Sequence, residues 1–414
     1  MSTRALRFLQ FAPAFAALPT SGAELRSHHL ARGMARWMEV THLGFSIAGA
    51  CSPFEERGVR YIPVPRERGY RAMDLARGAI GPVPFPVLNY TRQNMKAALY
   101  ETLGGPAFDI VQLESIHLAG YFPLLRRYAN RPRFVICDWH NIESALLAQS
   151  SRGRGGLAGR LYIEHQAKML ERYERWFVNQ CDAHIVVSGL DRDALQTYGV
   201  QRPVFVIPNG VDVQYFAAAN PVPASSRRRV LLVGSMDYHP NIDAAKYFAA
   251  EVWPQVYRTM PDTIFTVVGR NPSADVRALA DQPGIEITGS VPDVRPYYRE
   301  AFAVVVPLRA GGGTRLKILE AMAARIPVIS TAVGAEGLEA VPGLHYFEAN
   351  TPAAMCAALA EARHESPRVV QAISAGYELA KQRYDWRPLA DALASQLLGL
   401  AGVTRPQAVA AGSS

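Results

Sequence analysis

Short apolar runs alternate with longer stretches of helical spacing along most of the chain. This alternation is typical of a parallel sheet flanked by helices. It predicts strands in the first half at Leu6–Phe11, Val40–Phe45, Val59–Ile62, Ile110–Gln112, Phe134–Cys137, Ala183–Val187 and Val204–Ile207. In the second half it predicts strands at Val230–Val233, Ile264–Val268, Ile285–Thr288, Ala303–Pro307, Val328–Ser330 and His345–Phe347. Helices are predicted between them, for example at Leu161–Phe177, Ile242–Met260 and Leu389–Leu400.

A segment rich in Pro, Ser and Arg interrupts the pattern, and we predict a linker at 220–226. The expected fold is α/β, with two doubly wound Rossmann-like parallel-sheet domains at 1–219 and 227–385. Ligands of such sheets bind at the carboxyl ends of the strands, so the cleft between the domains is the expected site. We expect a helix at 386–403 to pack back on the first domain, and the end of the chain at 404–414 to be disordered.

The first residues of the chain admit two interpretations. Early arginines followed by apolar and small residues are found in signal peptides, but Arg7 and Gln10 interrupt the apolar run here. A buried strand that ends in a loop at Pro13 is the favoured interpretation.

The amino-acid composition indicates the structural class of the protein and its expected cellular compartment. The chain has 414 residues, 49% apolar and 19% charged, a globular composition that favours two domains. It contains no apolar run long enough, about 18 residues, to predict a membrane-spanning helix. The four cysteines are widely spaced, which argues against a zinc site and a disulfide framework. We therefore expect a cytoplasmic protein.

The net charge of +8 is unevenly distributed. Residues 1–220 carry 25 basic and 18 acidic side chains, whereas residues 221–414 carry 19 and 18. A basic first half suggests an acidic partner, such as the anionic inner face of a membrane or a phosphorylated acceptor. The scattered arginines fit a plain Arg-rich surface equally well. Nucleic acid is not expected, since no nucleic-acid motif accompanies the charge.

The most informative segment is a predicted strand that runs into three glycines and then into an amphipathic helix. Free N–H groups at the start of such a helix, and glycines without a Cβ, favour an anion. Cations in the first turn of a helix are unfavourable near the positive end of its dipole, and a bound diphosphate would explain their presence there. A carboxylate one turn later could accept hydrogen bonds from ribose hydroxyls. The residues concerned are Gly311, Gly312, Gly313, Thr314, Arg315, Leu316, Lys317 and Glu320.

A purely structural interpretation of this segment is a glycine turn followed by a Lys317–Glu320 ion pair on a solvated helix. A simple turn and a surface helix do not require three consecutive glycines and two cations in the first helical turn. We therefore favour the anion-binding interpretation. The spacing matches neither G-x-G-x-x-G nor a P-loop, so nicotinamide chemistry is not expected.

Residues 228–348 resemble the C-terminal domain of family 4 glycosyltransferases of the GT-B fold, in particular sugar transferases of bacterial exopolysaccharide systems. The motifs that carry the resemblance are Val233–Asn241, Val268–Arg270, Thr288–Val294, Gly311–Met322 and Pro327–Thr331. The first half adds Cys137–Ser144, Val186–Ser188 and Pro208–Asp212. The resemblance covers most of residues 5–390.

The resemblance implies a retaining, metal-independent transfer from a nucleoside diphosphate sugar, which is a substrate and not a cofactor. It implies that Glu320 holds the ribose and that backbone groups around Gly289 and Val291 read the base. Gly22 matches a glycine loop that faces the donor phosphates, Gly234 lies in the first motif, and His140 matches a histidine that contacts the transferred sugar. The implied acceptor is a glycan or a lipid-linked acceptor in polysaccharide or glycoconjugate biosynthesis.

The sequence departs from the family at three positions. Gly312 stands where most members have a further glutamate. Ser235 stands where most have an arginine, and Asn241 or His239 lies near the position of a lysine. We expect Arg315 and Lys317 to replace these two cations.

The only Asp-x-Asp motif, at Asp191 and Asp193, is interpreted as the first turn of a helix capped by Ser188, so no metal site is predicted. Two alternatives remain open: a GT-B sugar-nucleotide epimerase, and a degenerate protein that only binds sugar nucleotides.

Overall fold

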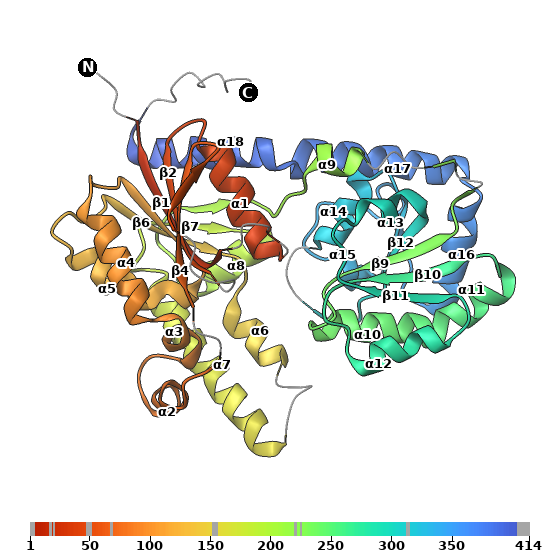
Figure 1. The fold of residues 1–414 in the computed structure, drawn as a ribbon, viewed down its shortest axis with the longest axis horizontal. Helices are drawn as coiled ribbons and strands as arrows, with labels where there is room; N and C mark the ends of the chain where they lie inside the picture. The colour runs from red at the N-terminus through yellow and green to blue at the C-terminus, as the bar shows by residue number, and fades with distance from the viewer. Residues whose placement is uncertain are drawn as a thin grey trace. The chain divides into compact units, whose positions relative to one another are not determined.

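The computed structural model describes residues 5–15, 19, 21–46, 52–66, 69–150, 156–218, 222–223, 226–311 and 315–403. The chain forms two compact units, one made of Met1–Asn209 with Trp386–Ser414 and the other of Gly210–Asp385. Each unit is a mainly parallel sheet covered by helices (Figure 1). The predicted α/β fold with two Rossmann-like sheets is therefore confirmed.

The first unit contains an eight-stranded sheet with the order β3-β4-β2-β1-β5-β6-β7-β8. Neighbouring strands run parallel, except that β3 and β4 are antiparallel. Its strands are β1 (Arg7–Phe15), β2 (Glu39–Ser46), β3 (Phe54–Glu56), β4 (Val59–Pro65), β5 (Ile110–Glu114), β6 (Phe134–Trp139), β7 (Ala183–Val186) and β8 (Val204–Val206).

Successive side chains of the central strands enter two different cores, one on each face of the sheet. Leu9 packs into the core that contains α4, α5 and α7, whereas Phe8 packs into the core that contains α1 and α18. The helices of this unit are α1 (Gly22–Met34), α2 (Ala72–Ile80), α3 (Phe85–Tyr90), α4 (Gln93–Gly104), α5 (Phe122–Arg127), α6 (Glu143–Ser150), α7 (Leu157–Phe177), α8 (Gly189–Thr197) and α18 (Trp386–Ala401).

Strand β1 is longer than predicted. It continues past Pro13 to Phe15, and its pairing with β2 shifts register between Ala12 and Phe15. Proline is tolerated at such an irregularity, because the ladder there does not need its missing N–H group. Antiparallel β3 was not predicted at all, since all three residues of Phe54–Glu56 are exposed and show no apolar alternation.

The second unit contains a six-stranded sheet with the order β11-β10-β9-β12-β13-β14, in which all neighbours are parallel. Its strands are β9 (Arg229–Val233), β10 (Ile264–Val268), β11 (Ile285–Gly289), β12 (Ala301–Val306), β13 (Val328–Ser330) and β14 (Phe347–Glu348). Its helices are α9 (Val213–Ala217), α10 (His239–Tyr247), α11 (Trp253–Thr259), α12 (Ala274–Arg277), α13 (Arg295–Glu300), α14 (Leu316–Ala323), α15 (Ala332–Ala335), α16 (Pro352–Arg363) and α17 (Pro367–Leu379).

The helix predicted at Ile242–Met260 is interrupted. A π-helical turn at Phe248–Val252 separates α10 from α11, and Pro254 lies in the first turn of α11. The missing N–H group of a proline in a helix interior accounts for such a break.

The two units divide earlier than the predicted linker. Val211 forms a bridge with Asp385, and Val213 and Phe216 belong to the core of the second unit. Val222, inside the predicted linker, donates its N–H to the carbonyl of Arg299. This segment is therefore part of the second unit, and the boundary falls after Asn209. The predicted disordered end, 404–414, lies outside the described residues.

The carboxyl ends of the central strands are the expected ligand edges of both sheets. In the second unit the chain order reverses at β9, which has β10 on one side and β12 on the other. In the first unit the same reversal occurs at β1, between β2 and β5. Ligands of doubly wound sheets bind at such switch points. In the part of the chain that the structure describes, no helix is both long enough and apolar enough to span a bilayer.

Candidate functional site

Two glycines bring the turns after β9 and β10 together in the second unit. A Cβ on Gly269 would lie 1.8 Å from the carbonyl oxygen of Gly234, so only glycine fits there. A Cβ on Gly234 would lie 2.7 Å from Asn241 Nδ2 and 3.1 Å from Lys317 Nζ. The first turn of this unit therefore lies directly beside the ammonium of α14.

Asn241 connects the turn to that ammonium. Its Nδ2 donates to the carbonyl of Ser235 at 2.9 Å, and its Oδ1 accepts from Lys317 Nζ at 2.6 Å. Burial, followed by the charge of Arg315, lowers the pKa of Lys317 to about 8. A cation held partly out of water beside another cation is costly unless an anion joins them. Lys317 from α14 thus supplies the cation at Asn241, near the position where the family carries a lysine.

A second cation, Arg270, contacts the same turn from the segment that follows β10. Arg270 Nε donates to Ser235 Oγ at 3.0 Å, and the guanidinium lies 3.8 Å from Asp237. By the resemblance described above, Ser235 stands where most members of the family carry an arginine. Arg270 was not predicted as a site residue, although its place directly after a buried strand and Gly269, at the carboxyl edge, was a usable signal.

Arg315 contacts the backbone of Gly311, the first of the three consecutive glycines. It is 4% exposed, and its Nη2 donates to the carbonyl oxygens of Gly311, at 2.8 Å, and Val333, at 3.2 Å. Burial lowers the pKa of its guanidinium. Gly311 has a φ of +130°, a conformation that favours glycine. Gly312, Gly313 and Thr314 lie outside the described residues.

Glu320 lies one turn further along α14. Tyr298, which is fully buried on α13, donates its hydroxyl to Glu320 Oε2 at 2.9 Å. Burial raises the pKa of Glu320, whereas this hydrogen bond and Lys317 lower it. The hydrogen bond from Tyr298 therefore fixes the direction of the carboxylate. Leu316, the first residue of α14, packs against the core below.

The loop after β11 contains the other predicted donor residues. Gly289 has a φ of +71°, and the space on the side of an added Cβ is open. Val291 packs against the core. Asp293 fixes the end of this loop, because it accepts from Tyr215 Oη at 2.9 Å and from Arg295 Nη2 at 2.8 Å.

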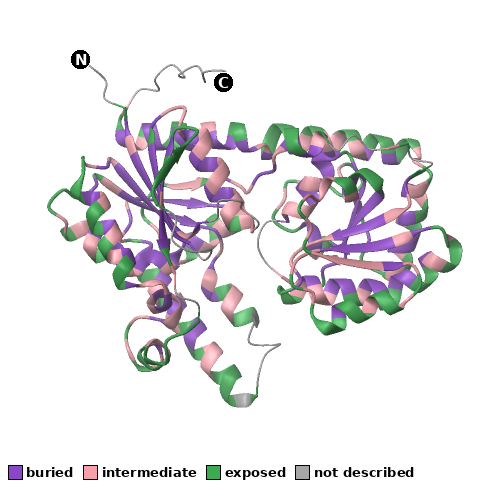
Figure 2. Cartoon of the chain, viewed as in Figure 1, coloured by how far each residue is buried: buried purple, intermediate pink, exposed green. Residues whose placement is uncertain are grey.

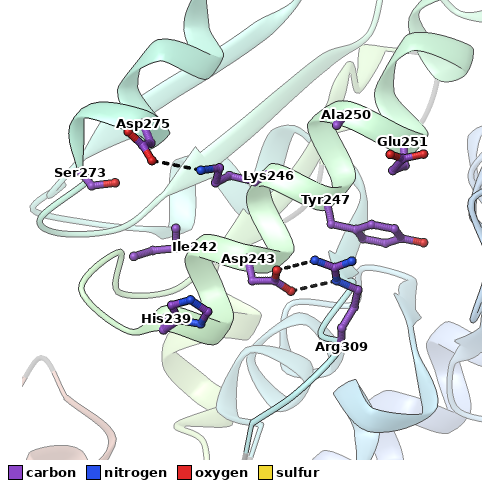
Figure 3. A pocket seen from close by; sticks show the side chains of 10 residues that line it. All are labelled: His239, Ile242, Asp243, Lys246, Tyr247, Ala250, Glu251, Ser273, Asp275 and Arg309. Carbon is purple, nitrogen blue, oxygen red and sulfur yellow. Dashed lines mark hydrogen bonds and ion pairs between the residues drawn. The ribbon is translucent and has the colours of Figure 1, made fainter. Parts of the chain in front are cut away.

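A cavity of about 520 Å³ lies on the outer side of α10, as Figure 3 shows. Four of its charged groups form two pairs: Arg309 with Asp243, and Lys246 with Asp275 at 3.0 Å. Since none of the predicted site residues lines it, we do not assign the donor to this cavity.

In the first unit, the predicted residues His140 and Gly22 lie near one buried polar network. Gly22 begins α1, which is capped by Ser21 and Glu24. His140 follows β6, and its Nε2 lies 4.0 Å from Glu114 Oε2. That buried nitrogen has no hydrogen-bond partner among the described residues. Burial lowers the pKa of His140 to about 4, so the imidazole is neutral at pH 7.

The network itself was not predicted, and it is fully buried. Arg26 of α1 lies 3.0 Å from Asp138 and donates to the carbonyl oxygens of Ile207, at 2.9 Å, and Pro208, at 3.1 Å. Gln10 Nε2 donates to Glu114 Oε1 at 2.5 Å. Burial, followed by the charge of Asp138, raises the pKa of Glu114 to about 8.

Glu114, Asp138 and His140 lie close enough together to hold a metal ion. The donor set fits a hydrogen-bonded network better, because the guanidinium of Arg26 already contacts both oxygens of Asp138. Ser27 Oγ contacts the remaining Glu114 oxygen. The interpretation of Asp191 as a helix start is confirmed, since Ser188 Oγ accepts from its N–H at the start of α8.

The structure thus brings Gly234, Gly311, Arg315, Lys317 and Glu320 together within the second unit. His140 and Gly22 belong to the first unit.

Comparison with known proteins identifies the family. Residues 20–215 match the family model Glycosyltransferase Family 4, and residues 227–364 match the model Glycosyl transferases group 1. A search of curated proteins gives no match.

Solved structures match over nearly the whole chain, at low identity. Sucrose-phosphate synthase from Thermosynechococcus elongatus is 16% identical, with a TM-score of 0.69 over 96% of this chain and 99% of that chain. A glycosyltransferase from Rickettsia africae is 13% identical, with a TM-score of 0.65 over 95% and 98%. HepE from Anabaena, solved with UDP and glucose, is 13% identical, with a TM-score of 0.61 over 95% and 99%. The chain belongs to the GT-B glycosyltransferases, with a family 4 first half and a group 1 second half.

Proposed function

We propose that this glycosyltransferase moves a sugar from a nucleoside diphosphate sugar to a glycan or lipid-linked acceptor, with retention of anomeric configuration and without a bound metal. The reaction belongs to polysaccharide or glycoconjugate biosynthesis at the cytoplasmic side of a membrane. The observation that carries the proposal is the meeting of Lys317 and Arg270 at the turn between Gly234 and Asn241.

The cations explain how a diphosphate leaves without a metal. Charge develops on the leaving diphosphate as the bond to the sugar breaks, and fixed cations that stabilise this charge are the largest catalytic contribution. Lys317 contacts Asn241 and Arg270 contacts Ser235. By the family resemblance, most members carry an arginine at the position of Ser235 and a lysine near Asn241 or His239. Arg315 contributes by anchoring Gly311, through its carbonyl, at the start of the glycine segment.

The remaining roles follow from position. Glu320, oriented by Tyr298, accepts hydrogen bonds from ribose hydroxyls, and the loop with Gly289 and Val291 contacts the base. His140, neutral and with Nε2 unpaired among the described residues, binds a hydroxyl of the transferred sugar. A nucleoside diphosphate donor is further supported by HepE, solved with UDP and glucose.

The test begins with a thermal-shift screen of nucleoside diphosphate sugars, since a ligand that binds the native state raises its melting temperature. The stabilising donor is then incubated, with a chelator present, with a lipid-linked acceptor. The proposal predicts a glycosylated product whose anomeric configuration, measured by NMR, equals that of the donor. An altered sugar nucleotide would instead identify an epimerase, and binding without turnover a degenerate protein. Transfer that stops with the chelator would contradict the metal-independent mechanism.

A double variant tests the cations. Arg270→Ala with Lys317→Ala should lower transfer by roughly 10²–10³-fold, equivalent to about 2.7–4 kcal/mol of transition-state stabilisation. Lys246→Ala is the matched control, because Lys246 is paired with Asp275 in the cavity outside α10. Unchanged turnover in the double variant would remove the proposed diphosphate site.

A further inference from the structure

Glu114 is the last residue of β5, and its side chain is buried within the first unit. The central strands of this sheet carry mostly the purple of buried residues in Figure 2. Glu114 Oε1 accepts hydrogen bonds from two amide groups, Gln10 Nε2 at 2.5 Å and Gln112 Nε2 at 3.3 Å. A buried carboxylate is costly when it is ionised without a paired cation. The other contacts of Glu114 therefore indicate whether it carries a charge.

The second oxygen of Glu114, Oε2, contacts the hydroxyl of Ser27 on α1. That hydroxyl also lies 3.0 Å from the carbonyl oxygen of Ala23. A serine hydroxyl has one hydrogen to donate, and a carbonyl oxygen can only accept. Both contacts are hydrogen bonds at the same time only if Ser27 donates to Ala23 and accepts from Glu114. The geometry therefore indicates a protonated Glu114 with the hydrogen on Oε2.

The charges around Glu114 agree with a neutral acid. Arg26 contacts both oxygens of Asp138, at 3.1 and 3.2 Å, and its Nη1 donates to the segment 207–209. Among the described residues, none of its hydrogen bonds goes to Glu114. One guanidinium thus pairs with one carboxylate, and a charge on Glu114 would be a second buried anion without a cation of its own. Burial, followed by the charge of Asp138, raises the pKa of Glu114 to about 8.

His140 is the neighbouring group that a charge on Glu114 would affect. Its Nε2 lies 4.0 Å from Glu114 Oε2, which is too far for a hydrogen bond. An ionised Glu114 at this distance would favour a protonated imidazole and draw it into an ion pair. A neutral Glu114, with its hydrogen directed at Ser27, does not compete for the imidazole. His140 Nε2 is then available to a ligand.

We propose that Glu114 is a positioning residue: as a neutral acid that donates to Ser27, it keeps His140 Nε2 available for a hydroxyl of the transferred sugar. This role rests on the proposed function, in which His140 contacts that sugar. It adds a buried acid that acts through His140 without touching the substrate, and it predicts that transfer weakens as Glu114 ionises.

The test is the pH profile of transfer between about pH 6 and about pH 10, with a chelator present and with the donor found by thermal shift. Wild-type kcat should fall about tenfold across a transition near pH 8, as much as the loss of the His140 contact, while KM for the donor changes less than about twofold. Glu114→Gln cannot ionise, and its amide can accept from Gln10 and donate to Ser27. It should match wild type at pH 7 and lack the alkaline fall.

Glu174→Gln is the matched control, because Glu174 is also a buried glutamate that contacts a serine, Ser144. Burial raises its pKa to about 7. This variant should keep the alkaline fall of wild type. A fall that persists in Glu114→Gln, or one that both variants remove, would overturn the proposal.

The proton on Glu114 can also be observed without any transfer. Wild type at pH 7 should show an infrared C=O band of a protonated carboxyl group that Glu114→Gln lacks. Absence of this difference would overturn the proposal even in an enzyme that transfers sugar. If the band is present and wild type transfers no sugar from any donor, the proposed function fails, and the role of Glu114 in it fails for that separate reason.

Discussion

The ammonium of Lys317 lies 2.6 Å from the side-chain oxygen of Asn241, although the two residues are 76 positions apart. Asn241 uses its other side-chain atom to hold the carbonyl of Ser235. The amide therefore fixes both the turn after β9 and the position of the cation from α14. Residues of two elements that are far apart in the sequence therefore meet at this turn.

The first prediction concerns the loss of folding stability that the charge of Lys317 causes. A lysine whose folded-state pKa is lowered to about 8 from 10.5 destabilises the ligand-free fold below about pH 8, and this cost disappears as the pH rises toward 10.5. Lys317→Met should therefore raise the free energy of unfolding at pH 7 by about 1 kcal/mol. The same variant should lose transfer activity. Urea denaturation and a transfer assay measure the two effects.

The control for Lys317→Met is Lys246→Met. Lys246 is exposed and paired with Asp275, so its removal should change the free energy of unfolding by less than about 0.5 kcal/mol and leave transfer intact. A Lys317 variant that is less stable than wild type without ligand would mean that the lysine is structural.

The second prediction concerns the hydroxyl that orients Glu320. Tyr298→Phe removes the donor to Glu320 Oε2 and leaves a half-buried carboxylate less satisfied. The free energy of unfolding should fall by about 1–3 kcal/mol, and nucleotide should bind roughly tenfold more weakly. Calorimetric titration with the nucleotide found in the thermal-shift screen measures the affinity.

Tyr346→Phe separates these two effects. Tyr346 is also buried, and it donates to Glu348 at 3.1 Å on the edge strand β14. Its loss should lower stability similarly while nucleotide affinity stays unchanged. Equal affinities of the two variants would show that Tyr298 does not act on the donor site.

The fold was predictable because its sheets are buried on both faces. The central strands are short and mainly apolar, as parallel strands covered on both sides require, and each predicted strand lies on or within a residue or two of a strand of the structure. The edge strand β3 has no such pattern and was missed. The domain boundary was placed too late, because Pro and Ser composition at 220–226 does not reveal that Val222 pairs with Arg299.

The sequence predicted the site residues that lie close together in one segment, but not those that distant elements bring together. Arg315, Lys317 and Glu320 share one helix start, so the sequence brings them together. Arg270 and the buried pair of Arg26 with Asp138 depend on contacts between distant elements. In the sequence alone, a single charged residue at the end of a strand cannot be told from a surface residue. Only the structure shows that β6 lies beside β5 and that α1 contacts both.

The third prediction compares two buried histidines. His184 is satisfied at both nitrogens, by Trp139 Nε1 at 3.0 Å and by the carbonyl of Val178 at 2.7 Å. His140 keeps Nε2 without a partner among the described residues. His140→Ala should lower turnover at least about tenfold, equivalent to about 1.4 kcal/mol, with little change in nucleotide affinity or stability. His184→Ala should instead destabilise the fold by about 2–4 kcal/mol. An effect of His140→Ala on affinity alone would contradict contact with the transferred sugar.

The last prediction is a pH dependence of stability that originates at Glu114. Its pKa is raised to about 8, so the folded protein keeps a proton that the unfolded chain loses near 4.5. Its stabilising contribution is present below the unfolded value and is lost as the pH rises through the folded one. Glu114→Gln, which cannot titrate, should therefore gain about 1–3 kcal/mol relative to wild type between about pH 5 and about pH 8. Urea denaturation across this interval measures the difference. Glu171→Gln, at a side chain 44% exposed on α7, should follow wild type. Parallel curves for wild type and Glu114→Gln would mean that Glu114 is ionised in the fold, and that Arg26 neutralises two carboxylates instead of Asp138 alone.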